Sequence, residues 1–302
     1  MNPGALVGVA AGLSAGALWG LVFVAPRMVG HFGMVDITAA RFVVFGAVAG
    51  LAVWWRPAAQ RWPDARQAFT VLGLSGLGFS GYYLLLAFSI MNAGTEVPSL
   101  IIGTIPVWMM LLGRPAGLRM QALLPGLALT AAGIALMVHA AWPQEGIGAA
   151  RPHFGQGLLL AVLAMASWTA FGLLNAAWLK RHPGVHAADW ANWLGIATGL
   201  GAFALWLAAG SDVETLRAQP DGALFAMLAL AGGLGSSWLA TVLWNIASQR
   251  LSASLCGQLI VSETLFALLY SFLWDGRWPH ASEFAAALLF VLGILASIKA
   301  HR

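Results

Sequence analysis

The chain has 302 residues, of which 60% are hydrophobic and 9% are charged, and its formal net charge is +4. A soluble domain carries about 25% charged residues, so a surface this poor in charge cannot face water throughout. The Lys and Arg residues lie in short hydrophilic breaks rather than in one basic run, which excludes a nucleic-acid-binding patch. The composition predicts an all-α integral membrane protein whose outer surface faces lipid.

Apolar segments long enough to cross a bilayer recur along the whole chain, because a spanning helix needs about 20 mostly apolar residues. Charged residues, Pro and Gly separate ten such segments: 4–25, 36–55, 69–91, 97–113, 120–141, 157–179, 187–209, 223–247, 253–274 and 282–299. The segment 97–113 is the shortest. Pro106 and Pro125 are expected to kink the fourth and fifth helices. No basic stretch of a signal peptide precedes the first segment, so we expect it to be retained.

The placement of Lys and Arg predicts the orientation of these spans. With ten spans, ten of the fifteen Lys and Arg residues fall at the termini and in the loops on the same side, and four fall on the opposite side. The fifteenth, Arg41, lies within a span. Cytoplasmic loops carry an excess of Lys and Arg, so we expect both termini in the cytoplasm and a multi-pass protein of a bacterial inner membrane.

Short motifs recur in the same order in the two halves of the chain. The matched pairs are Ala17–Gly20 with Ala166–Thr169, Gly76–Gly78 with Gly233–Gly235, Thr104–Trp108 with Ser262–Phe266, and Gly133–Ile134 with Gly293–Ile294. They predict two five-helix repeats, 1–141 and 157–302, joined by a periplasmic linker, 142–156. An odd number of helices per repeat inserts the second copy upside down, and inverted repeats around a shared site are a common plan of transporters.

Several of these motifs resemble those of a known family. They are Leu18-Trp19-Gly20, the Ala-Ala-Arg-Phe stretch Ala39–Phe42, and Pro106-Val107-Trp108. Ser262–Phe266 is similar to a Glu-Pro-Val-Phe pattern, although Thr264 replaces the proline. The whole chain resembles the EamA-type, ten-helix members of the drug/metabolite transporter superfamily. This resemblance implies a secondary transporter, and the family includes exporters of amino acids, with the aromatic amino-acid exporters as similar relatives.

Glu263 is the only carboxylate well inside a predicted span, where a charge costs about 2.5–3.5 kcal/mol on insertion scales. We interpret it as a site for a substrate ammonium group or a proton. The alternative is a protonated packing residue that donates to a hydroxyl of the span 223–247. Gln258 and Ser262 share one face of the same helix, where they either contact substrate or hydrogen-bond to neighbouring helices.

Trp19 and Trp168 lie at mid-helix in matching repeat positions, where an interfacial belt explains them poorly. With Tyr82, they are predicted to form the wall of a substrate cavity. Arg41 either holds a substrate carboxylate or extends to the interface, and an interfacial role is expected of Asp189. Weaker candidates for the cavity are Phe79, Ser99, Thr104, Trp238 and Asn245.

Glycine spacing also suggests close helix packing and raises an enzymatic alternative. Gly12, Gly16 and Gly20 form a G-x-x-x-G ridge, and Gly195 and Gly199 form another. Two G-x-S-G strings, around Ser75 and Ser80, resemble those of intramembrane serine proteases. A serine nucleophile needs a base within hydrogen-bond reach, whereas all seven histidines lie in loops or at helix ends. We therefore expect no enzyme, and neither a zinc-binding H-E-x-x-H motif nor a P-loop occurs.

These observations predict an exporter of amino acids, aromatic ones included, or of similar small metabolites by alternating access. Its cavity is expected between the first, third, fourth, sixth, eighth and ninth spans. Alternatives are an exporter of hydrophobic cationic drugs or other metabolites, a passive channel, and an intramembrane hydrolase. The expected partners are a small-molecule substrate and the lipid bilayer, without nucleic acid, metal or cofactor, and the protein is expected to be a monomer.

Overall fold

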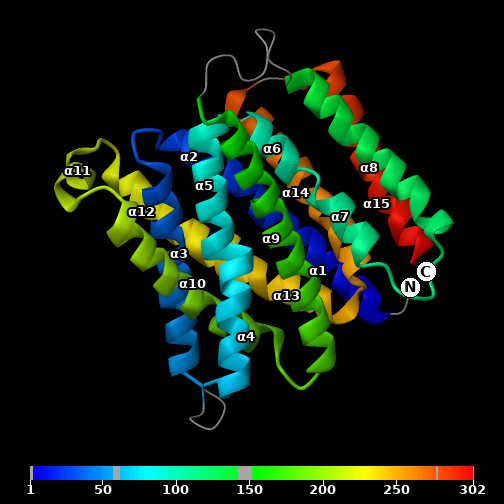
Figure 1. Ribbon diagram of the computed structural model, residues 1–302, viewed down its shortest axis with the longest axis horizontal. Coiled ribbons are helices and arrows are strands. Elements are labelled where there is room, and N and C mark those ends of the chain that lie inside the picture. Colours follow the sequence, from blue (N-terminus) through cyan, green and yellow to red (C-terminus); the bar gives the residue numbers. More distant parts are fainter. Residues whose placement is uncertain (1–2, 57–61, 95, 142–151, 277, 302) are drawn as a thin grey trace.

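The computed structural model describes the chain except for residues 1–2, 57–61, 95, 142–151, 277 and 302. Every regular element in the described part is helical, which confirms the all-α prediction. Figure 1 shows long helices lying alongside one another as a bundle. Most of the predicted linker, residues 142–151, lies outside the described residues.

The helical elements of the two halves follow one another along the chain. The first half has α1 (Pro3–Gly20), η1 (Leu21–Phe23), α2 (Ala25–Met28), α3 (Met34–Trp54), α4 (Ala65–Ser75), η3 (Gly76–Ser80), α5 (Gly81–Ala93), α6 (Glu96–Ile102), α7 (Ile105–Leu112) and α8 (Met120–Ala141). The second half has α9 (Phe154–Arg181), α10 (Ala187–Ala209), α11 (Val213–Ala218), α12 (Gly222–Ala231), η4 (Gly232–Leu239), α13 (Ala240–Arg250), α14 (Ala253–Asp275) and α15 (Ala281–Ala300).

Nine helical segments in the described residues are long and apolar enough to cross a membrane, and each falls on one of the ten predicted spans. The remaining prediction, 97–113, corresponds to the shorter apolar helix Val97–Leu112. This segment is broken between α6 and α7, because Pro106 at the start of α7 has no N–H to continue the ladder. In the described residues, nine of the ten predicted spans therefore have the length and the apolar composition of a membrane crossing.

Two spans contain a wide helical turn that the sequence pattern did not predict. The span Ala65–Ala93 passes through the π-helical segment η3, and the span Gly222–Arg250 passes through the π-helical segment η4. At the ends of these segments Gly81 N–H donates to Gly76 O, and Ala240 N–H donates to Gly235 O. Each π turn changes the direction in which the following side chains point, and such turns are frequent at functional sites.

Glycines bring the helix backbones into close contact. A Cβ on Gly16 of α1 would lie against the Ser262 hydroxyl of α14, and one on Gly20 would meet the backbone of Ala267. In the pair α3 and α10, a Cβ on Gly199 would lie 2.7 Å from the Cα of Gly46. The glycine ridges therefore act as predicted, as packing surfaces between helices.

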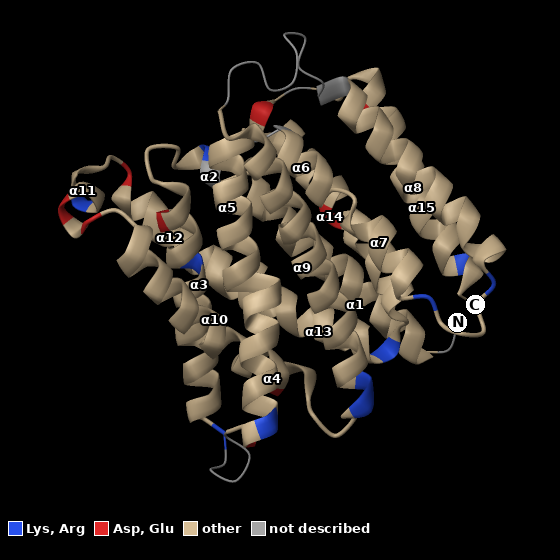
Figure 2. Cartoon of the chain, viewed as in Figure 1, with Lys and Arg blue, Asp and Glu red and all other residues tan. Residues whose placement is uncertain are grey.

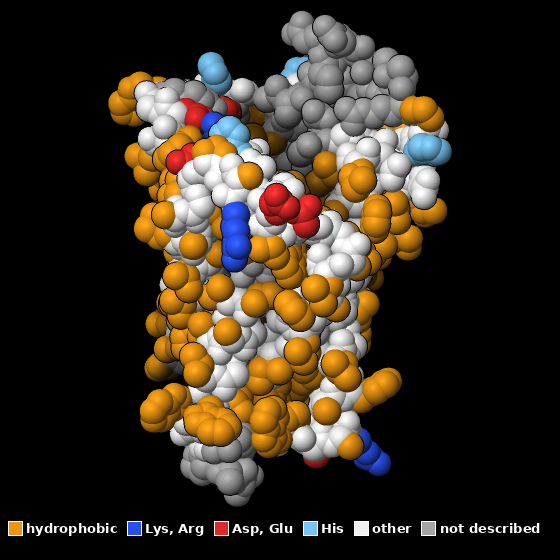
Figure 3. Space-filling model, turned by 90° about the vertical axis from the view of Figure 1, so that its left-hand side faces the viewer, with side chains coloured by type: hydrophobic (Ala, Val, Ile, Leu, Met, Phe, Trp, Pro, Cys, Tyr) orange, Lys and Arg blue, Asp and Glu red, His pale blue; other side chains and the backbone are white. Residues whose placement is uncertain are grey.

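Both termini lie at one end of the bundle, here called the terminal end, and the other end is called the distal end (Figure 1). Figure 2 shows Lys and Arg gathered at the terminal end, as the charge pattern predicts, and more of the acidic residues at the distal end. The face seen in Figure 3 is mainly hydrophobic across its middle, with charged side chains toward its ends. This distribution fits a bundle embedded in lipid, with its two ends in water.

Polar contacts connect the helices at both ends. At the terminal end, Arg56 and Asp189 form an ion pair at 2.8 Å. Asp189 therefore connects α10 to the end of α3, in addition to the interfacial role expected of it. At the distal end, Asp36 accepts hydrogen bonds from the backbone N–H and the hydroxyl of Ser211. Asp212 caps α11, and the bonds donated by the Thr215 backbone N–H and then its hydroxyl lower the pKa of this carboxyl.

Candidate functional site

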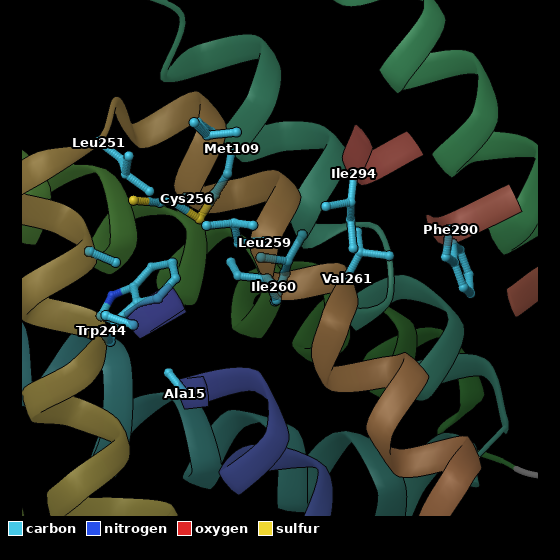
Figure 4. Packing of buried hydrophobic residues seen from close by; sticks show 14 of the residues in the cluster. Ala15, Met109, Trp244, Leu251, Cys256, Leu259, Ile260, Val261, Phe290 and Ile294 are labelled. Atoms are coloured by element: carbon cyan, nitrogen blue, oxygen red, sulfur yellow. The ribbon is translucent and has the colours of Figure 1, made fainter. Parts of the chain in front are cut away.

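Three tryptophans from three helices meet inside the bundle. Trp19 of α1 lies 6.3 Å from Trp168 of α9 between ring centroids, and 5.4 Å from Trp244 of α13. Trp168 and Trp244 lie 6.1 Å apart. Figure 4 shows Trp244 within the buried hydrophobic cluster that includes Ala15 of α1. The structure thus brings together the two tryptophans that the repeats match, and adds a third.

Further aromatic rings extend this group across the bundle. Phe171 of α9 contacts Trp168 at 5.9 Å and Phe79 of η3 at 5.3 Å between centroids. Phe79 in turn contacts Phe42 of α3 at 5.9 Å. The central aromatic cluster is defined as Trp19, Phe42, Phe79, Tyr82, Tyr83, Trp168, Phe171 and Trp244. Tyr82 belongs to it through Tyr83, at 5.0 Å, and is buried.

Arg41 lies at one edge of this cluster. Only 8% of the residue is exposed, and its Cζ lies 4.5 Å from the ring centroid of Phe42 and 5.2 Å from that of Tyr83. Such stacking over aromatic faces stabilises a guanidinium. Its aliphatic stem packs beside Gly232 at the start of η4. The burial argues against the alternative in which Arg41 extends to the interface.

Glu263 of α14 is partly exposed within its span. A Cβ on Gly16 of α1 would lie 3.1 Å from its backbone N, one turn before Trp19 of the central aromatic cluster. Among the described residues no hydrogen bond to its carboxylate is found, so the alternative in which it bonds a hydroxyl of the span 223–247 is not seen. The carboxylate is thus carried on a helix that packs against α1 beside the central aromatic cluster, and Arg41 lies at another edge of that cluster.

Gln258 and Ser262 make contacts that account for their polarity by packing. The Gln258 carbonyl oxygen accepts from Thr130 of α8 at 3.3 Å and from Ser297 of α15 at 3.0 Å, and its amide donates to Thr130. Ser262 donates to Leu259 O and lies against Gly16. These contacts favour the interhelical alternative for Gln258, whereas the Ser262 hydroxyl bonds within its own helix and its side chain packs against α1.

The weaker candidates are spread over several places. Trp238 donates to Asn192 Oδ1 at 2.7 Å, and Asn245 accepts from Asn175 and donates to Ala187 O, which links α9, α10 and α13. Thr104 donates to Ile101 O at the break between α6 and α7, whereas Ser99 is exposed on α6. Phe79 alone of this group joins the central aromatic cluster.

Two hollows are described on the bundle. One, of about 210 Å³, lies at the distal end and is lined in part by Asp36, Phe203 and Phe225. The other, of about 320 Å³, lies at the terminal end and is lined in part by Arg114, Lys180 and Ser252. Neither is lined by Glu263 or by the central aromatic cluster, so the predicted mid-membrane cavity remains a proposal.

Within the described residues, neither serine of the two G-x-S-G strings is hydrogen-bonded to a catalytic base. Ser75 shares a hydrogen bond of 2.9 Å with Thr198 of α10, and the buried Ser80 hydroxyl has no hydrogen-bond partner in the described part of the chain. In the same part, no group of three or more His, Cys, Asp or Glu side chains could hold a metal ion. This arrangement gives the hydrolase alternative no geometric support.

Sequence reasoning passed over several members of the central aromatic cluster. Phe171 follows Trp168 by three residues and therefore shares its helix face, a signal that was available. The contact between Phe42 and Tyr83 could not be predicted from spacing, because it depends on how α3 and α5 pack. The aromatic content of the site is thus larger than expected and comes from more helices.

Comparison with known proteins gives a consistent assignment. Residues 155–298 match the EamA-like transporter family. The chain is 30% identical to the inner membrane protein YtfF of Escherichia coli (strain K12) over 310 residues, which cover 97% of this chain and 95% of the relative. A solved structure titled only as the crystal structure of a protein has the same fold, with a TM-score of 0.78 and 22% identity over 98% of this chain and 97% of its own. The chain therefore belongs to the EamA-like transporter family of the drug/metabolite transporter superfamily, and is a multi-pass membrane transporter of the inner membrane.

Proposed function

We propose that this transporter exports amino acids, aromatic ones among them, or similar small metabolites across the inner membrane by alternating access. The observation that carries the proposal is the placement of a buried guanidinium, Arg41, at one edge of the central aromatic cluster, with a carboxylate, Glu263, on the helix that packs against α1 beside Trp19. A guanidinium pairs well with a carboxylate, and a carboxylate with an ammonium group. An α-amino acid carries both groups, and an aromatic side chain can stack on the tryptophans.

The proposed mechanism uses two inverted repeats of five helices, with ten spans and both termini in the cytoplasm. Four features support it. The family match covers residues 155–298, nearly the whole predicted second repeat. The two π segments contain the matched glycines of the two halves. The helices pair as such a symmetry requires, α3 with α10 and α8 with α15. Lys and Arg gather at the end that holds both termini.

A second candidate substrate class is a hydrophobic organic cation. Three tryptophans within 6.3 Å of one another and a single nearby carboxylate form a setting that attracts cations. Arg41 opposes this function, because its positive charge repels a cation that lacks a carboxylate. The amino-acid proposal uses both charges and is therefore preferred.

Counterflow in proteoliposomes tests the substrate class. Proteoliposomes that contain the purified protein are preloaded with each amino acid of a panel, with a quaternary ammonium compound as a further member, and are assayed with and without a pH gradient. We expect saturable exchange of zwitterionic amino acids. Exchange of the quaternary ammonium compound alone would favour the cation exporter, and non-saturable flux of all solutes would indicate a channel.

Two substitutions test the site. Glu263→Gln removes the charge, and a hydrogen bond to a charged group contributes about 1.5–3 kcal/mol, so we expect flux at limiting solute to fall by roughly 10- to 100-fold. Trp168→Ala removes the stacking surface, and flux is expected to fall as well. Matched controls are Glu214→Gln on the exposed α11 and Trp274→Ala, which is 51% exposed. Equal flux in the site variants and the controls, at equal amounts of folded protein, would contradict this site.

A further inference from the structure

Three polar side chains follow one face of α13 toward the terminal end. Thr241, Trp244 and Ser248 are spaced by three and four residues, which places them on the same side of a helix. Each is at most 1% exposed. We call these three residues the α13 polar face.

The polar atoms of this face are poorly satisfied. The Thr241 hydroxyl and the Trp244 indole N–H have no hydrogen-bond partner in the part of the chain that the structure describes. Ser248 faces only the thiol of Cys256, a weak hydrogen-bonding group. Because buried polar groups are nearly always paired, a run of such atoms on one face needs an explanation. Water or solute would pair with them if this side of α13 became accessible.

The face begins at the proposed site and ends near the terminal end. Trp244 contacts Trp19 and Trp168, whereas Ser248 lies close to the end of α13 at Arg250. Cys256, near the start of α14, belongs to the same buried cluster as Trp244 (Figure 4). A path along this face would therefore lead from the central aromatic cluster to the terminal end.

The first half of the chain shows that the fold does not require polar residues here. Gly76 matches Gly233, and the same offset aligns Thr241, Trp244 and Ser248 with the apolar residues Leu84, Ala87 and Met91 of α5.

The two helices also differ in their surroundings. Met91 is 75% exposed and Leu84 is 38% exposed, because α5 packs chiefly against α9. In contrast, α13 packs against α1, α10 and α9, which buries its polar face. The polar face of α13 is thus enclosed by neighbouring helices, whereas the matching positions of α5 include exposed apolar side chains, as on a surface that faces lipid.

From the unpartnered polar atoms on one buried helix face that leads away from the aromatic cluster, we infer that Thr241, Trp244 and Ser248 line the half of the solute path at the terminal end. That half is closed in this structure, and it opens and fills with water in the alternate state. The inference rests on the proposed function, because it assumes transport by alternating access.

Single-cysteine labelling tests the inference without knowledge of the solute. Cys256 is the only cysteine, so Cys256→Ala gives a cysteine-free background. Thr241→Cys and Ser248→Cys are treated, in vesicles of both orientations, with a charged methanethiosulfonate that does not cross membranes. We expect modification from the side of the terminal end only. If Cys256→Ala does not fold, the native background replaces it, and the modified residue is identified by mass spectrometry.

Ala247→Cys is the matched control, because Ala247 is 0% exposed, adjoins Ser248 and lies against α1, where a Cβ on Gly12 would be 3.6 Å away. We expect Thr241→Cys and Ser248→Cys to react at least tenfold faster than Ala247→Cys. A smaller ratio for both, or reaction from the distal side, would overturn the inference.

A second pair of variants distinguishes a role in the solute path from a role in helix packing. Thr241→Val and Ser248→Ala remove hydroxyls that lack good partners, so a path role predicts an unchanged or higher melting temperature and at least threefold lower flux. A lower melting temperature with unchanged flux would show a packing role and overturn the inference. Labelling on the terminal side without exchange of any amino acid would instead contradict the proposed substrate while leaving the path intact.

Discussion

Gln258 shows that a polar residue in a membrane helix can either contact the solute or connect neighbouring helices. Its position four residues before Ser262 and five before Glu263 suggested a shared substrate face. The side chain instead connects α14 to Thr130 and Ser297 on the paired helices α8 and α15. In lipid, a polar group without water must find a partner in a neighbouring helix, and this one finds two.

Gln258→Ala is therefore expected to lower stability rather than transport. Interhelical hydrogen bonds in membranes contribute about 0.6 kcal/mol each, so we expect a loss of about 1–2 kcal/mol in the free energy of unfolding. The measurement is thermal unfolding in detergent together with flux per folded protein. Ser297→Ala, which removes one of the bonds, should show a smaller loss. A large drop in flux at unchanged stability would contradict this expectation and show that Gln258 contacts the substrate.

At the scale of the helices, glycine decides which pairs come closest. Gly46 of α3 and Gly199 of α10 meet backbone to backbone, so neither helix can accommodate a side chain at that point without moving. Gly50 lies one turn farther along α3, and a methyl group added there would meet no heavy atom within 4 Å, although its sequence context is similar. The same residue type thus has a packing role at one position and none at the next.

Gly199→Ala is expected to destabilise the protein by about 1–3 kcal/mol, because the added methyl group meets backbone that cannot rotate away. Gly50→Ala is the matched control and should be neutral or stabilising by up to about 1 kcal/mol, since alanine favours a helix over glycine. Melting temperatures in detergent measure both. Equal melting temperatures of the two variants would show that α3 and α10 are not in close contact.

At the scale of the whole molecule, polar contacts between helices close the terminal end. Arg56, just after α3, and Asp189 in the first turn of α10 hold this end together, and Asn175, Asn245 and Trp190 add hydrogen bonds there. Alternating access would require the contacts at the terminal end to separate.

Asp189→Asn weakens this closure and should favour the alternate state. In the Ser248→Cys background, we expect labelling from the terminal side to become at least threefold faster, because the ion pair opposes opening. Asp275→Asn, which weakens the pair with Arg27 at the distal end, is the matched control and should give no increase. An unchanged rate in both variants would show that the ion pair at the terminal end does not hold the closed state.

The sequence by itself determined the class of the protein and the approximate limits of its helices. Apolar runs of about 20 residues mark spans because lipid offers no hydrogen bonds to an exposed backbone, so only regular helices satisfy it. The gathering of Lys and Arg at one end could also be predicted, because the loops on the cytoplasmic side carry an excess of these residues. The expected fourth span is the exception, because Pro106 divides it into α6 and α7.

Only the tertiary structure decided which polar and aromatic residues meet. Trp19 and Trp168 were expected together, but Trp244 reaches them through the packing of α13, and Phe42 reaches Phe79 of the same cluster through the packing of α3. Gln258 and Glu263 differ in their surroundings although they share a helix, and the π turns that set side-chain directions in two spans left no clear periodic signal. Sequence spacing gives the face of one helix, whereas contact between helices depends on glycine positions and local turns spread over the whole chain.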